Sequence, residues 1–335
     1  MSTGVVDAVL PSAELHLHLE GTLEPSTIFE LAERNRVRLP YADVDELAAR
    51  YDFADLQSFL DLYYANMATL RTAQDFADMT DAYLARAAVA GVVHAEVFVD
   101  PQAHTARGVA LEEVLDGVGS ALAAAPSVYG ITTGLIPCVL RDRSAADAMT
   151  MLDGVLRSGV PVLGLGLDSA EVGNPPSVFR DVFDRAGAEG LHRVAHAGEE
   201  GPPAYVWEAL DLLGAERIDH GVRSLEDDEL VARLVRQRTP LTVCPLSNVR
   251  LRVIDDLADH PLPEMIRRGL VVTVNSDDPA YFGGYLDDNM TALRAACDID
   301  DAAAELLARN SVEASFLDGD RKRELLSRID AAVTS

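Results

Sequence analysis

The stretch Ala13-Glu14-Leu15-His16-Leu17-His18-Leu19-Glu20-Gly21 alternates apolar and polar side chains with a period of two. This pattern predicts a strand over residues 12–18, from which His16 and His18 project on one face. Two imidazoles one pleat apart can both bind a single metal ion at Zn–N distances of about 2.0–2.1 Å. For an isolated His-x-His motif, a pair of surface or hydrogen-bonded histidines is an equally good explanation. Other motifs in the chain are needed to distinguish a metal site from a pair of surface or hydrogen-bonded histidines.

Three further motifs each follow an apolar, strand-like run: His196-Ala197-Gly198-Glu199, Asp219-His220-Gly221 and Ser276-Asp277-Asp278-Pro279. Together with the first motif, they place potential metal ligands or acid–base groups at the ends of four predicted strands. Four such motifs are hard to explain as chance. His16, His18, His196 and Asp277 together offer three imidazole nitrogens and one carboxylate, a set suited to one zinc ion with room for a water molecule.

Two other polar residues in these motifs are candidates for proton transfer. Glu199 lies on the loop three residues after His196, close to the predicted metal yet free to reach a substrate, which is where a general acid is wanted. A solvated acidic loop is the alternative for Glu199 and its neighbour Glu200. His220 could orient or deprotonate a water molecule at the metal, and a hydrogen-bonded core histidine is its alternative role.

Composition narrows the class of protein. The chain has 335 residues, 48% of them hydrophobic, and a formal net charge of -27 from 28 basic and 55 acidic side chains. Such a charge repels phosphate groups, so we expect no nucleic-acid and no membrane partner. Lys322 is the only lysine, which leaves no central amine for Schiff-base chemistry, and three widely spaced cysteines predict no disulfide framework. The N-terminus lacks a targeting signal and no apolar run is long enough to span a bilayer, so we expect a cytoplasmic protein.

Strand and helix patterns alternate along the chain. Strands are predicted at residues 12–18, 92–99, 131–140, 162–167, 193–195, 217–219, 241–245 and 270–275, with amphipathic helices between them. Residues 40–72 are helical in pattern and rich in aromatics, which predicts an insertion after the first strand, and the chain after residue 286 is helical. This pattern predicts one (β/α)₈ barrel domain over residues 1–335, with the polar chemistry at the carboxyl ends of the strands. A doubly wound sheet is the alternative, but the glycine fingerprint expected after its first strand is absent.

One motif is misleading. His94-Ala95-Glu96 has the His-x-Glu form of the cytidine-type zinc deaminases, but that class also requires a Pro-Cys-x-x-Cys motif, which this chain lacks. We therefore interpret His94 and Glu96 as structural groups inside the barrel. His104, His192 and His260 have no comparable context and are interpreted as ordinary polar residues.

The four motifs at the strand ends resemble the signature blocks of the adenosine/adenine deaminase family, within the metal-dependent amidohydrolase group. They occur in family order and span residues 14 to 285. The resemblance implies a zinc-dependent barrel hydrolase that replaces the 6-amino group of a purine with oxygen and releases ammonia. It also implies that His16, His18, His196 and Asp277 hold the zinc.

The resemblance implies roles for four further residues. Glu199 would protonate ring N1 as a zinc-bound hydroxide attacks C6, His220 would hold the hydroxide in line, and Asp278 would hydrogen-bond N7. Ser169 stands where the nucleoside deaminases usually have a glycine whose backbone N–H meets N3. A backbone donor survives this change, but the serine side chain alters the floor of the pocket.

Two stretches, residues 100–108 and 278–285, resemble the branch of the family that acts on the free base. They imply hydrolysis of adenine to hypoxanthine and ammonia, a purine-salvage reaction. The alternatives are deamination of adenosine, aminodeoxyfutalosine or an N6-substituted adenine, another metallohydrolase of the amidohydrolase group, or a non-catalytic barrel that binds purine or zinc. A small 6-aminopurine is the expected partner, and assembly into a homo-oligomer stays open.

Free adenine is expected to be strongly preferred over adenosine. Tyr281 and Phe282 follow Asp278 directly, and we place them, with aromatics from residues 51–64, over the mouth of the pocket. Free adenine also carries an N9–H that adenosine lacks, and Asp168 and Glu96 are the candidate acceptors for it. Loss of such a hydrogen bond can be worth about 10⁴–10⁵ in discrimination.

Overall fold

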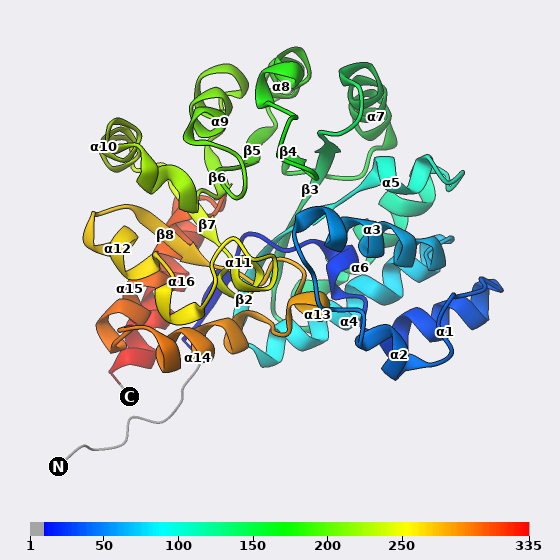
Figure 1. Cartoon of the computed structure of the whole chain (residues 1–335), viewed down its shortest axis with the longest axis horizontal. Helices are drawn as coiled ribbons and strands as arrows, with labels where there is room; N and C mark the ends of the chain where they lie inside the picture. Colours follow the sequence, from blue (N-terminus) through cyan, green and yellow to red (C-terminus); the bar gives the residue numbers. More distant parts are fainter. Residues whose placement is uncertain (1–9, 335) are drawn as a thin grey trace.

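Eight parallel strands, paired in chain order from β1 to β8, form the barrel of the computed structural model (Figure 1). The strands are β1 Ser12–Glu14, β2 Val92–Val99, β3 Thr132–Leu140, β4 Gly164–Asp168, β5 His192–Ala197, β6 Arg217–His220, β7 Pro240–Val243 and β8 Val271–Val274. The structure describes residues 10–334; residues 1–9, where the sequence predicts no targeting signal, and residue 335 lie outside this range. The predicted (β/α)₈ fold is confirmed, and the uninterrupted strand order excludes a doubly wound sheet.

The first strand differs from its predicted bounds. Its regular pairing with β2 ends at Glu14, and the chain beyond it makes only isolated bridges, from Leu17 to Asp277 and from His18 to Phe98. The N–H of His18 donates to the carbonyl of Asp277, and the N–H of Asp277 donates to the carbonyl of His16. These bonds close the barrel between β1 and the end of β8, and they hold the two histidines at the closing point.

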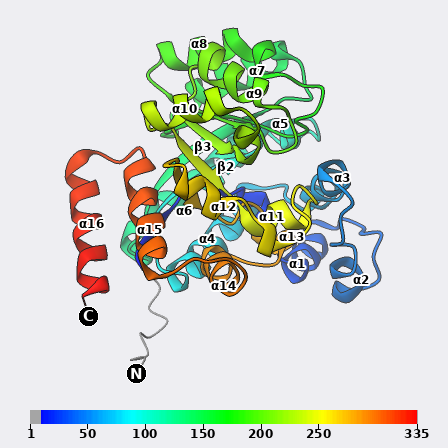
Figure 2. The same ribbon diagram turned by 60° about the vertical axis from the view of Figure 1, so that its left-hand side comes forward.

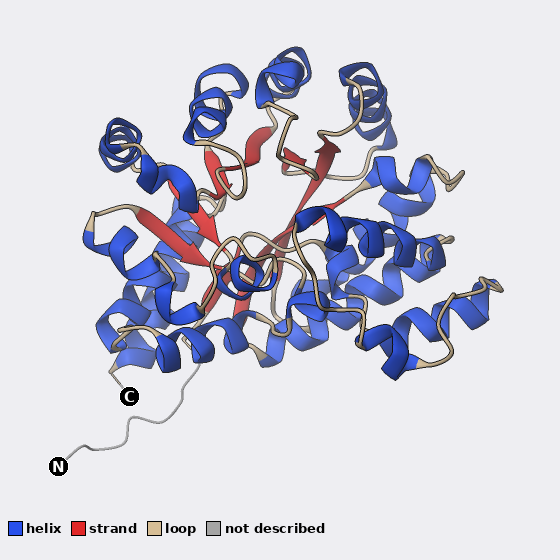
Figure 3. Ribbon diagram, in the orientation of Figure 1, coloured by secondary structure: helices blue, strands red, loops and turns tan. Residues whose placement is uncertain are grey.

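Helices surround the strands on the outside (Figure 3). They are α1 Pro25–Asn35, α2 Val44–Ala48, α3 Leu56–Asn66, α4 Ala73–Val89, α5 Pro101–Thr105, α6 Leu111–Val128, α7 Ala145–Ser158, α8 Arg180–Ala188, α9 Pro203–Glu208, α10 Asp228–Gln237, α11 Pro245–Arg250, α12 Leu262–Arg267, α13 Pro279–Phe282, α14 Leu286–Ala296, α15 Asp301–Ala314 and α16 Gly319–Val333. Among the described residues, none of these helices is both long and apolar enough to cross a membrane.

The two predicted additions to the barrel are present. The insertion between β1 and β2 contains α2 and α3, and the C-terminal segment forms α14 to α16. Figure 2 shows α15 and α16 on one side of the barrel and α1 to α3 on the opposite side. Helix α15 packs on β8 and β1, where Asn310 donates to the carbonyl of Val272 and Ser311 accepts from the N–H of Ala13.

A buried ion pair forms the floor of the barrel. Arg217, at the start of β6, is fully buried and donates to Glu96 of β2 across 2.5 Å. Glu96 also accepts from the N–H of Phe316 at 2.6 Å and contacts His94 Nε2 at 3.1 Å, and the Arg217 guanidinium lies over the Phe316 ring. The structural interpretation of His94 and Glu96 is therefore correct. The prediction that Glu96 accepts a hydrogen bond from substrate N9–H is wrong, because its carboxylate already accepts from Arg217 and from the N–H of Phe316.

We expect Glu96→Gln to lower the free energy of unfolding by about 3–5 kcal/mol at neutral pH, because it leaves the buried Arg217 charge without its partner. Burial opposes ionisation of Glu96, but Arg217 and His94 outweigh it and bring its pKa from 4.5 down to about 2. A depressed folded pKa means that the stabilisation is complete above the unfolded value of 4.5 and disappears as the pH falls toward about 2. The difference in unfolding free energy between native protein and Glu96→Gln should therefore decrease as the pH falls from 4.5 toward about 2.

Urea denaturation at a series of pH values measures this difference. Asp184→Asn is the matched control, because it removes a carboxylate from an exposed i,i+4 pair with Arg180 and should cost no more than about 1 kcal/mol. If both variants lost the same small amount of unfolding free energy, the ion pair between Glu96 and Arg217 would not contribute to the stability of the barrel.

Candidate active site

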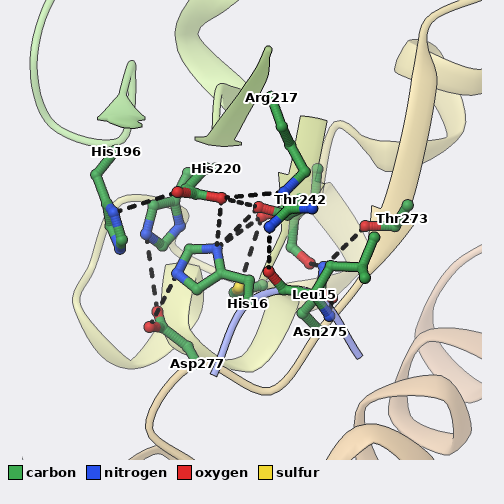
Figure 4. A network of polar contacts seen from close by, with 12 residues as sticks. Leu15, His16, His196, Arg217, His220, Thr242, Thr273, Asn275 and Asp277 are labelled. Atoms are coloured by element: carbon green, nitrogen blue, oxygen red, sulfur yellow. Dashed lines mark hydrogen bonds and ion pairs between the residues drawn. The ribbon is translucent and has the colours of Figure 1, made fainter. Parts of the chain in front are cut away.

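Four predicted ligands converge at the carboxyl ends of the strands. His16 and His18 follow β1, His196 is on β5 and Asp277 follows β8, and one donor atom from each lies within 4.8 Å of the others. Asp277 Oδ1 is 3.3 Å from His16 Nε2 and 3.5 Å from His18 Nε2, and the Nε2 atoms of His18 and His196 are 3.1 Å apart. Figure 4 shows His16, His196 and Asp277 turned toward one point.

This cluster fits a metal ion. His16 Nε2 is buried with no hydrogen-bond partner. His18 Nε2 and His196 Nε2 face each other, and because the Nδ1 atom of each ring faces an oxygen acceptor, both Nε2 atoms present lone pairs to the same point. Tetrahedral ligands at about 2.0–2.1 Å from zinc are themselves roughly 3.4 Å apart, close to the observed separations. Three nitrogens and one carboxylate oxygen also form a donor set typical of zinc.

The outward nitrogens of the histidines are held by other groups. His16 Nδ1 is 3.0 Å from the Thr242 hydroxyl, which itself donates to Asp219 at 2.7 Å, and His196 Nδ1 is 3.0 Å from the carbonyl of Leu167. Such contacts select the tautomer that directs Nε2 toward a metal. Sequence reasoning missed Thr242, because a threonine inside an apolar strand carries no signal of its own.

Electrostatics favour the metal-binding protonation states of His18, His196 and Asp277. Burial lowers the pKa of His18 to about 4 and that of His196 well below its ordinary value, so both rings are neutral near pH 7. Burial acts to lower the pKa of His16 as well, but the Asp277 and Asp219 charges outweigh it and raise that pKa. Burial opposes ionisation of Asp277, but the facing imidazoles of His16, His220 and His18 hold its pKa well below the usual range. Neutral imidazoles and an ionised carboxylate are the metal-binding forms.

Glu199 and His220 lie beside this cluster, as predicted. Glu199 Oε2 is 3.6 Å from His220 Nε2, and the other carboxyl oxygen of Glu199 is buried without a partner. Burial raises the pKa of Glu199 well above its ordinary value, reinforced by the Asp277 and Glu171 charges. Burial lowers the pKa of His220 to about 3. Burial therefore favours the protonated form of Glu199 and the neutral form of His220, and the two groups lie beside each other.

Glu171 holds the loop that carries Glu199. Its carboxylate accepts four consecutive backbone N–H groups, those of residues 198 to 201, at 2.7 to 3.1 Å. The Glu200 side chain in turn accepts the N–H of Leu56 at the start of α3. Sequence reasoning did not assign Glu171 a role, because nothing in a lone glutamate after β4 reveals that it faces a distant loop.

Asp278 and Ser169 both line the pocket, as predicted. Asp278 is buried with Oδ1 unpartnered, and a Cβ on Gly21 would lie only 2.6 Å from its Cα, so this position requires glycine. Ser169 adopts a left-handed φ of 71°, and its hydroxyl accepts from Tyr64 at 2.9 Å. His220 and Asp277 are also left-handed, each with φ of 62°. Left-handed residues other than glycine are strained, and such strain concentrates at functional sites.

A narrow cavity lies over the cluster. Its apolar wall comes mainly from α3 and α13: Leu56, Phe59, Leu60, Tyr63, Tyr64, Leu251 and Phe282. The predicted aromatic cover is thus confirmed for Phe282 and part of residues 51–64. It is wrong for Tyr281, whose ring stacks on Tyr51 behind the wall and whose hydroxyl accepts from Asn66.

The remaining histidines divide by environment. His104 is fully buried and contacts Glu20 at 2.7 Å, and His260 is buried against Asn248. His192 is half-buried beside Glu216 at the other end of the barrel. Among the described residues, none of the three lines the cavity. His104, however, belongs to a buried network under the pocket wall and is more than an ordinary polar residue.

Comparisons with known proteins agree with this geometry. The sequence model described as adenosine deaminase matches residues 11–332. An adenine deaminase of Streptomyces coelicolor is 62% identical over 324 residues, which cover 97% of this chain and 95% of the relative. The crystal structure of adenine deaminase from Arthrobacter aurescens superposes with a TM-score of 0.97 at 58% identity, covering 97% of this chain and 100% of that one.

An amidohydrolase from Burkholderia ambifaria, solved with bound Zn, superposes with a TM-score of 0.88 at 25% identity and covers 100% of this chain and 97% of its own. The family match covers nearly all of the described residues, including every strand end discussed above. The chain belongs to the adenosine deaminase family.

Proposed function

We propose that the chain hydrolyses adenine to hypoxanthine and ammonia with one zinc ion per chain. The observation that carries this proposal is the juxtaposition of a zinc donor set with the buried carboxyl group of Glu199 at the base of a narrow, aromatic-walled cavity. Relatives 58% and 62% identical over nearly the whole chain bear the name adenine deaminase, and a more distant one carries Zn. A binding protein without activity has no use for a proton donor beside a metal site.

Each residue of the site then has a role. Zinc held by His16, His18, His196 and Asp277 supplies Lewis acidity, which acidifies water at neutral pH. Glu199 donates its proton to ring N1, which makes C6 electrophilic, and His220 positions the attacking water on the metal side of the ring. The water oxygen bonds to C6 and the bond from C6 to the amino nitrogen breaks. Of the two water protons, one leaves with the amino group as ammonia and the other restores the carboxyl group of Glu199.

Asp278 and Ser169 orient the base. Burial raises the pKa of Asp278 well above its ordinary value, so its carboxyl group can donate a hydrogen bond to N7. The backbone N–H of Ser169 faces N3. The narrow cavity suits a flat ring system and leaves little space for a ribose. We further propose that the protein works in the cytoplasm as one domain on small purines, without nucleic-acid or membrane partners, and that its site is complete in a single chain.

We expect kcat/KM for adenine to exceed that for adenosine by at least ~10²-fold, and up to about 10⁴–10⁵-fold if the site hydrogen-bonds N9–H. Ammonia release should be measured over adenine, N6-methyladenine, adenosine and aminodeoxyfutalosine. Asp277→Ala protein, purified in the same way, corrects for contaminating deaminases. Adenosine turned over as efficiently as adenine would refute the proposal of a pocket built for the free base.

A further inference from the structure

Two buried carboxyl groups line the cavity on the side formed by β2 to β4. Asp100 follows β2 directly and is 1% exposed; Asp168 ends β4 and is 2% exposed. An oxygen of each lies within 4.8 Å of the other and of a His18 ring nitrogen. The proposed function uses neither group. Two adjoining carboxyls, nearly free of water, need partners to offset their desolvation.

Asp168 has a neighbour for one of its two oxygens, whereas its Oδ1, like that of Asp100, is buried with no hydrogen-bond partner. Its Oδ2 is 3.6 Å from His18 Nδ1, the outward nitrogen of an imidazole whose Nε2 faces the ligand cluster. A carboxylate in this place orients a metal-binding histidine and fixes its tautomer. Asp168 is therefore a positioning residue for His18.

Asp100 is held firmly, and one of its two side-chain oxygens lacks a hydrogen-bond partner. Its backbone N–H donates to Glu20 at 3.0 Å, and Glu20 is fixed in turn by His104 at 2.7 Å. The Asp100 side chain receives a long contact, 3.5 Å, from the Tyr63 hydroxyl to Oδ2, and its carboxyl group also pairs with that of Asp168. Its Oδ1 is buried with no hydrogen-bond partner. A rigid, unpartnered acceptor that lines a cavity requires a donor on the ligand.

The orientation of the base brings such a donor to this side. Glu199, His220 and Asp278 occupy the β5, β6 and β8 side of the cavity and take the C6, N1 and N7 positions. The edge that remains carries N3 and N9, and it faces Asp100. In free adenine N9 bears a hydrogen; in a nucleoside it bears a carbon, which would press against a buried carboxyl oxygen and leave it unpaired.

We infer that Asp100 accepts the hydrogen bond from N9–H and is the residue that selects the free base over N9-substituted purines. This inference rests on the proposed function for the orientation of the ring. Of the two acceptors predicted from the sequence, Asp168 is directed at His18 through Oδ2, and Glu96 is engaged with Arg217 and does not line the cavity.

The test compares adenine with 9-methyladenine, which differs from it only by a methyl group on N9. Native protein should prefer adenine by at least ~10²-fold in kcat/KM. In Asp100→Ala, kcat/KM for adenine should fall by about 10²-fold, while that for 9-methyladenine falls less than tenfold or rises, because the acceptor is lost and space opens for the methyl group. Asp100→Asn retains an amide oxygen that can accept N9–H, so it should keep most of the preference.

The control is Asp142→Ala, which removes an exposed carboxylate just after β3 and should leave both rates unchanged. Metal content is measured in every variant. An equal loss for the two substrates in Asp100→Ala would assign Asp100 a structural role only and overturn the inference.

Inhibition of the native protein gives a second measurement that does not depend on folding of a variant. Purine should inhibit at least ~10²-fold more tightly than 9-methylpurine, and equal inhibition would overturn the inference. Native protein that binds purine in preference to 9-methylpurine but does not deaminate adenine would refute the proposed function and leave the N9–H acceptor standing.

Discussion

His16→Ala and Asp277→Ala proteins are expected to lose the metal ion and to deaminate adenine at least ~10³-fold more slowly than native protein. Each substitution removes one of the four converging ligands. A metal ion supplies several kcal/mol of stabilisation to the transition state, and every 1.36 kcal/mol is a factor of ten in rate. Elemental analysis and an ammonia-release assay measure the two losses.

The matched control is His192→Ala. His192 begins β5, the strand that carries His196, but it pairs with Glu216 away from the cavity. This variant should keep about one zinc per chain. Full zinc occupancy in His16→Ala would show that the ligands have been wrongly assigned.

Glu199→Gln should keep its zinc and its fold but lose about 10²–10⁴-fold in kcat, the range for a positioned general acid. The amide has the size of the carboxyl group and cannot deliver the proton. The loop should stay in place, because Glu171 holds it through backbone N–H groups that the substitution leaves unchanged.

Glu200→Gln is the control for this variant. It makes the same chemical change one residue further along, at a half-buried side chain whose oxygen can still accept from Leu56, and it should retain kcat within about threefold. Near-native turnover in Glu199→Gln would move the proton donor elsewhere, and His220 would be the first residue to test.

The sequence was sufficient to predict the barrel and the converging ligands because both depend on local patterns. Alternation in residues 13–18 and the apolar runs before His196 and Asp277 mark strands, and parallel strands of a barrel end at a common face. Once the strands are assigned, residues separated by more than 200 positions must meet. The ends of the strands were predicted less well. Strand β1 ends at Glu14, and beyond it the chain makes isolated bridges, among them one to Asp277 after β8, in place of regular pairing.

Contacts that depend on side-chain direction were not predictable in this way. Glu171 and Asp100 each follow a strand, but so does Asp142, which is exposed. Which of them turns inward depends on distant partners such as the loop of residues 198–201. Tyr281 was placed over the mouth for the same reason: the sequence marks a bulky ring beside the site but not that Tyr51 stacks on it from behind.

The left-handed backbone at His220 and Asp277 has a consequence for the stability of the whole domain. A side chain in this conformation costs about 1–2 kcal/mol relative to glycine. Selection for thermal stability alone would therefore favour glycine at both positions. The resulting barrel would be more stable to heat but would lack catalytic activity. The enzyme keeps its chemistry at the expense of resistance to heat, and mutational searches for heat-resistant variants should exclude these two positions.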